Sequence, residues 1–104
     1  MELTLTTEKV AVFNDWLKRF ESATLDPRHI GIYTGIRYGL EKLGIYQKVT
    51  VQHNEGIFFV TRGTLNDLFE RIEQNKIHAL WNIGHASGIA WVLNKFDLYE
   101  LPNG

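Results

Sequence analysis

The amino-acid sequence predicts an α+β fold, in which a helical hairpin and a third helix pack on a small antiparallel sheet built from a β-hairpin and C-terminal strands. Three patterns predict this fold. Apolar residues recur at helical spacing, strand-like alternation surrounds a turn in the middle of the chain, and apolar runs return near the C-terminus. The chain has 104 residues, so we expect a single domain over residues 1–104.

Each predicted helix begins at a capping residue and carries one apolar stripe. The first spans residues 8–22 after Thr7, the second starts at Asp26-Pro27, and the third follows Thr64. The stripes consist of Val10, Phe13, Leu17 and Phe20 in the first helix, of Ile32, Tyr33, Ile36, Leu40 and Leu43 in the second, and of Leu65, Leu68, Phe69 and Ile72 in the third. Only a short connection separates the first two helices, which favours an antiparallel hairpin.

The middle of the chain predicts strands. Residues 2–5 and 48–52 alternate in polarity, whereas residues 57–60 form a short apolar run. A turn signal over residues 53–56 lies between the last two segments and predicts a β-hairpin. Because its second strand is apolar on both faces, we expect that strand to be covered on both sides.

The C-terminal region, where residues 77–94 contain no charged side chain, is compatible with two structures. Its polar residues argue against a membrane helix. We favour strands at 78–83 and 89–93 around a loop, with a third strand at 96–101. The alternative is one helix containing Gly84 and Gly88, in which each glycine costs about 1 kcal/mol relative to alanine.

Composition excludes several classes of protein. The chain has no cysteine, so it has no disulfide, no thiolate nucleophile and no cysteine-based zinc site. A net charge of −1 argues against generic nucleic-acid binding. The N-terminus lacks the features of a secretory signal, and we expect a cytoplasmic protein without a membrane partner.

The sequence contains no complete catalytic or metal-binding motif. The four histidines lack the spacing of a helical zinc pair. His53 and Glu55 match the start of a zinc deaminase signature whose cysteines are missing. Residues 84–88 resemble a nucleophile elbow, but Ser87 stands one place late. We therefore expect no catalytic residue, no cofactor and no metal.

Three glycines inside the second predicted helix form the most unusual pattern. Gly31, Gly35 and Gly39 fall on one ridge beside the apolar stripe. Together they cost about 3 kcal/mol relative to alanines, which calls for a compensating contact. Either another element of the same domain lies on the ridge, or a partner docks there. The substitution Gly35→Leu unfolds the domain in the first case and abolishes binding in the second.

We expect a small non-enzymatic protein that binds and modulates another protein, of the regulator or inhibitor type that mobile elements often encode. The absence of a catalytic motif, the short chain and an aromatic content of 12% favour this class. A partner with an acidic surface fits the cations beside the ridge. The candidate partner-binding residues are Arg28, Gly31, Gly35, Arg37, Tyr38, Gly39 and Lys42.

Two other classes stay open. The first is a nucleic-acid-binding module that uses Arg28, Arg37 and Lys42, which a steep loss of affinity with salt would support. The second is a small enzyme or ligand binder, which a histidine of perturbed pKa in a pocket would support. Its candidate pocket consists of His78, Trp81, His85, Ser87 and Trp91.

Overall fold

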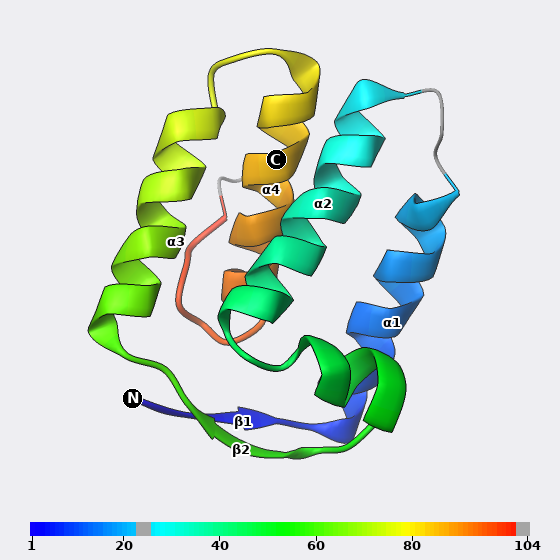
Figure 1. Cartoon of the computed structure of the whole chain (residues 1–104), viewed down its shortest axis with the longest axis vertical. Coiled ribbons are helices and arrows are strands. Elements are labelled where there is room, and N and C mark those ends of the chain that lie inside the picture. The colour runs from blue at the N-terminus through cyan, green and yellow to red at the C-terminus, as the bar shows by residue number, and fades with distance from the viewer. Residues whose placement is uncertain (23–25, 102–104) are drawn as a thin grey trace.

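The computed structural model describes residues 1–22 and 26–101, which form four α-helices, a short π-helix and a two-stranded antiparallel sheet. In chain order the elements are β1 (Glu2–Leu5), α1 (Thr7–Glu21), α2 (Pro27–Lys42), η1 (Lys48–Gln52), β2 (Gly56–Phe59), α3 (Arg62–Asn75) and α4 (Leu80–Asn94). Successive α-helices alternate in direction, and the sheet lies at one end of the helical bundle (Figure 1). The predicted α+β class is confirmed, and so is the strand at residues 2–5, whereas residues 48–52 and the C-terminal region do not form the expected strands.

The helical hairpin is confirmed, with small shifts at its ends. The side chain of Thr6, not Thr7, caps α1 by accepting a hydrogen bond from the Lys9 amide at 3.1 Å. Asp26 caps α2 in the same way at 2.9 Å from the Arg28 amide, and Pro27 follows as the first helical residue. The two helices run in opposite directions (Figure 1).

Residues 48–52 form the π-helix η1, so the prediction of a strand there is wrong. Val49 donates a backbone hydrogen bond to the Ile45 carbonyl at 3.0 Å, and the Thr50 hydroxyl donates to the Tyr46 carbonyl at 2.9 Å. Val49 is fully buried, while Val51 is 68% exposed. One buried valine and one exposed valine resemble a strand in sequence, but local helical bonds satisfy this backbone instead.

The strand β2 pairs with β1 rather than with residues 48–52, so the predicted hairpin is wrong. The antiparallel register places Leu3 opposite Phe58 and Thr4 opposite Ile57. Phe58 faces the helices and is buried, whereas Ile57 and Phe59 are 56% and 75% exposed. Because the sheet lies at the end of the bundle, helices cover only one face, and the expectation of cover on both faces is wrong.

The helix α3 has the predicted stripe but starts earlier than predicted. The hydroxyl of Thr61, not of Thr64, caps the helix and accepts a hydrogen bond from the Thr64 amide at 3.1 Å. Leu65, Leu68 and Ile72 are buried. The stripe therefore faces the core, as the spacing predicts.

Residues 80–94 form the helix α4, so the favoured strands at 78–83 and 89–93 are wrong and the alternative, one helix containing Gly84 and Gly88, is confirmed. Ile89, Val92 and Leu93 have no exposed surface. A helix surrounded in this way carries no continuous polar face, and its sequence therefore lacks the helical periodicity that reveals amphipathic helices.

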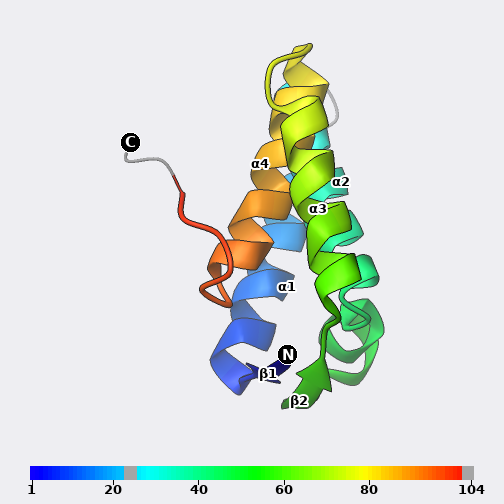
Figure 2. The same ribbon diagram turned by 90° about the vertical axis from the view of Figure 1, so that its left-hand side faces the viewer.

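Residues 96–101 do not form the predicted third strand either. The chain turns after α4, with Asp97 in the left-handed conformation at φ 58° and the Leu98 amide donating to the Leu93 carbonyl at 3.0 Å. It then folds back alongside α4 (Figure 2). The side-chain amide of Asn94 ties this segment to the helix by donating to the Tyr99 carbonyl at 3.0 Å.

Glycines hold α2 and α4 in direct backbone contact. A Cβ atom added at Gly31 would lie 2.1 Å from the Trp81 carbonyl oxygen, and one added at Gly35 would lie 2.1 Å from that of His85. Glycines of α4 meet α2 in return, because a Cβ at Gly84 would lie 2.0 Å from the Arg28 carbonyl oxygen. Another helix of the same domain therefore covers the glycine ridge, which is the first of the two interpretations of this pattern.

We predict that Gly35→Ala lowers the free energy of unfolding by about 2 kcal/mol or more. The overpacking against the His85 backbone outweighs the gain of about 1 kcal/mol in helix propensity. Gly63→Ala is the matched control, since the nearest atom to its added Cβ lies 3.8 Å away. Denaturant unfolding should show Gly63→Ala at or above wild-type stability. Equal stability of the Gly35→Ala variant would contradict the contact.

Candidate functional site

The residues predicted to bind a partner do not form one accessible surface. Gly31, Gly35 and Gly39 are buried, the first two against the backbone of α4 and the third against Val92. Tyr38 is half-buried, and the guanidinium of Arg71 lies 4.2 Å from its ring centre. The glycine ridge is thus part of the core.

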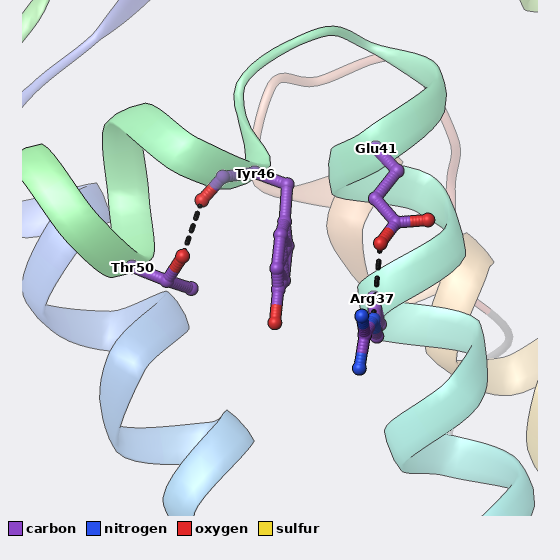
Figure 3. A network of polar contacts seen from close by, with 4 residues as sticks. All are labelled: Arg37, Glu41, Tyr46 and Thr50. Carbon is purple, nitrogen blue, oxygen red and sulfur yellow. Dashed lines mark hydrogen bonds and ion pairs between the residues drawn. The ribbon is translucent and has the colours of Figure 1, made fainter.

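The cations beside the ridge are mostly paired within the molecule. Arg37 donates to the Glu41 carboxylate at 3.0 Å and lies 5.0 Å from the centre of the Tyr46 ring (Figure 3). The hydrogen bond to Glu41 raises the pKa of Arg37. Lys42 lies 3.5 Å from the Asp67 carboxylate, while Arg28 is exposed. Two of the three cations that a nucleic-acid interface on α2 would use are therefore balanced by carboxylates.

A polar network around His85 links α2, α3 and α4. His85 is 2% exposed, and its Nδ1 lies 2.9 Å from the Thr34 hydroxyl. Its Nε2 accepts a hydrogen bond from Arg71 Nε at 2.9 Å. The Thr34 hydroxyl donates to the Gly31 carbonyl at 2.8 Å, so it is free to accept from Nδ1. These directions define a neutral imidazole that carries its proton on Nδ1.

The surroundings of His85 favour this neutral form. Burial, together with the positive charge of Arg71, lowers the pKa of His85 to about 4. The Trp81 ring stacks on the imidazole at 4.8 Å with an interplanar angle of 12°. Because both ring nitrogens already hold hydrogen-bond partners, His85 acts as a structural link between helices. Arg71 and Thr34, its partners, carry no sequence signal that marked them in advance.

The predicted His and Ser cluster is divided by the helix that carries it. Ser87 lies about 200° around the axis of α4 from His85 and faces a groove instead. Trp91 lines the same groove, Trp81 belongs to the His85 network, and His78 is exposed ahead of the helix. Among residues 1–22 and 26–101, no group of three His, Asp or Glu side chains is placed to hold a metal ion.

The groove is a largely apolar cavity of about 390 Å³ along α4. Small side chains, Ala86, Ser87 and Ala90, line it on α4, and the Trp16 and Trp91 rings stack beside them at 4.3 Å. The remaining lining comes from α2, from α3 and its C-cap Lys76, from the first turn of α4 and from the C-terminal segment, and consists of Ile32, Ile72, Lys76, Ile83, Tyr99 and Leu101. The run of small residues signals such a groove only when residues 80–94 are known to be helical.

The outer edge of β2 is the second surface available for binding. Met1 and Val60 exchange two backbone hydrogen bonds of 2.9 Å. Because bonded and non-bonded pairs alternate in antiparallel ladders, the amide and carbonyl groups of Ile57 and Phe59 point away from β1. They meet no partner strand in the described part of the chain. The strand also lacks the lysines and prolines that protect exposed edges.

Two general findings frame these sites. None of the helices over the described ranges is long and apolar enough to cross a membrane. Comparisons with models of known protein families, with curated proteins and with solved structures found no match to this chain. The functional assignment therefore depends on the geometry of the groove and of the β2 edge.

We predict that the His85 ring titrates with a pKa of about 4, well below the 6.5 of an unperturbed histidine. The unfolded chain then binds one more proton than the native chain between these pH values. The free energy of unfolding therefore falls by roughly 1.4 kcal/mol per pH unit as the pH decreases through this window.

Nitrogen-15 NMR of the imidazole measures both the titration and the tautomer. The spectrum at neutral pH should show protonated Nδ1 and unprotonated Nε2. A ring that titrates near 6.5, or that carries its proton on Nε2, would contradict the network.

Proposed function

We propose that this is a non-enzymatic protein that binds another protein and modulates it, and that β2 is the docking element. The observation that carries the proposal is the open edge of β2. Ile57 and Phe59 are 56% and 75% exposed on a strand whose outward backbone groups have no partner strand in the described chain. The occupant we propose is an extended segment of the partner that adds to the sheet as a third strand.

Strand addition uses both properties of this edge. The partner backbone pairs with the outward amide and carbonyl groups, and its alternate side chains cover Ile57 and Phe59. Exposed aromatic side chains such as Phe59 supply apolar contact area that association removes from water. Glu55 and Arg62 flank the strand with opposite charges and are both exposed. A segment with an acidic residue near Arg62 and a basic residue near Glu55 fits this pattern best.

The other two classes have less support. On α2, Arg37 and Lys42 are paired with carboxylates, which reduces the positive potential that a nucleic-acid interface needs. His85 has hydrogen bonds at both ring nitrogens and faces away from Ser87, which leaves it unsuited to act as a base for that hydroxyl.

We predict that Ile57→Lys and Phe59→Lys each weaken partner binding by about tenfold or more. Each replaces an apolar side chain that the partner would cover with a charged one. Val51→Lys is the matched control, because Val51 is also exposed, at 68%, but lies on η1 rather than on the strand. The measurement starts from capture out of a lysate of the native host, followed by affinity measurement with the isolated partner.

Hydrogen exchange gives an independent check. The outward amides of Ile57 and Phe59 should gain protection when the partner binds. Unchanged affinity in both edge variants would refute docking at β2. Light scattering tests the other occupant: a dimer that Phe59→Lys dissociates would mean that a second copy covers this edge, and the proposed partner strand would be wrong.

A further inference from the structure

We propose that the groove along α4 binds a small amphiphile with an apolar body and an anionic head, such as a medium-chain carboxylate. The groove lies along the helices and includes no residue of β1 or β2, so this inference is independent of the proposed docking at the sheet. Different parts of the lining accommodate the apolar body and the anionic head.

The apolar body fits the part of the groove against α4. Ala86 and Ala90 stand one turn apart, and their small side chains leave room above the helix. The stacked Trp16 and Trp91 rings form one wall, and Ile72 of α3 contributes to the lining as well. A volume of about 390 Å³ lies within the usual range of small-molecule sites, roughly 300–1,000 Å³. Displacing water from this lining favours an apolar chain.

The anionic head fits Lys76. Among the described residues that line the groove, Lys76 is the one with a charged side chain. Its ammonium lies 2.7 Å from the Glu73 carboxylate, and this hydrogen bond raises the pKa of Lys76. The Glu73 carboxylate offsets part of the charge of Lys76, but it occupies only one of the three ammonium donors, and the remaining N–H groups can donate to a ligand carboxylate.

Two residues that carry hydroxyl groups also line the groove. Tyr99 packs on the α3 side, where its ring centre lies 6.3 Å from that of Phe69, and Ser87 is exposed on α4. A lining with a few polar groups around an apolar body is typical of sites that orient an amphiphile rather than take up an apolar molecule in any direction.

The experiment uses decanoate and 1-decanol as probes, with binding measured by calorimetry and by the fluorescence of the tryptophans that line the groove. Wild-type protein should bind decanoate saturably and more tightly than 1-decanol. Ala90→Leu and Ser87→Phe fill the groove and should each weaken both probes by about tenfold. The second variant changes an exposed position, which protects the test against a folding defect in the first.

Lys76→Met separates the head from the body. It should weaken decanoate by about tenfold and leave 1-decanol unchanged. Lys95→Met is the matched control for charge, because the Lys95 ammonium lies 5.2 Å from the Trp91 ring centre but outside the groove lining. Ala11→Leu, on the exposed face of α1, is the matched control for the filling variants. Both controls should bind like wild type.

Four results would overturn the inference. Absence of saturable binding by either probe would refute the site. Unchanged binding in Ala90→Leu and Ser87→Phe would place the probes elsewhere on the molecule. An equal effect of Lys76→Met on both probes, or an equal loss of decanoate affinity in Lys95→Met, would refute the anionic head at Lys76.

Discussion

The contact between α2 and α4 places two helix backbones against each other, because glycines stand where side chains would otherwise hold the helices apart. Gly31 and Gly35 meet carbonyl oxygens of α4, and Gly84 and Gly88 meet carbonyl oxygens of α2. Each glycine costs about 1 kcal/mol of helix stability, which close packing and Cα–H···O contacts offset. The two helices behave as one unit, and the rest of the molecule packs around it.

The glycine contact also positions the polar network around His85. The Thr34 hydroxyl donates to the Gly31 carbonyl and is hydrogen-bonded to the imidazole of His85. The glycine contact therefore also sets the position of this imidazole, which accepts a hydrogen bond from Arg71 of α3. A buried network of this kind stabilises one arrangement of helices only while all of its members have partners. Among the described residues that are not exposed, no side-chain nitrogen or oxygen is buried without a hydrogen-bond partner. A further side of α4, which carries the small residues Ala86, Ser87 and Ala90, lines the groove.

The sequence was informative where one face of an element meets solvent. The stripes of α1, α2 and α3, and the Asp26-Pro27 start of α2, follow from periodicity and capping alone. The glycine ridge was visible as well, but the helix that covers it was only the less favoured alternative for residues 77–94, because α4 is apolar on nearly all sides. The pairing of β1 with β2 joins residues as far apart as Met1 and Val60, and no local signal predicts that pairing.

The candidate sites were harder to predict for the same physical reason. The groove needs walls from α1, α3 and the C-terminal segment, and the role of His85 needs Thr34 and Arg71 from two other helices. Ser87 and Trp91 were noticed as ligand-pocket residues and do line one groove, yet His85 and Trp81 lie on another side of α4. The exposed β2 edge appears only once the sheet is known to have two strands in the described chain, and the exposure of Ile57 and Phe59 only once helices are known to cover one face.

Nuclear Overhauser effects between the α-protons of Gly35 and Gly88 test the backbone contact most directly. A Cβ placed on Gly88 would lie 3.0 Å from the Cα of Gly35, so the proton in that position should give a strong cross-peak across the two helices. Similar cross-peaks should join Gly84 to α2 near Arg28. Their absence, with the helices at the 8–10 Å separation that is roughly usual for side-chain-packed pairs, would contradict the account.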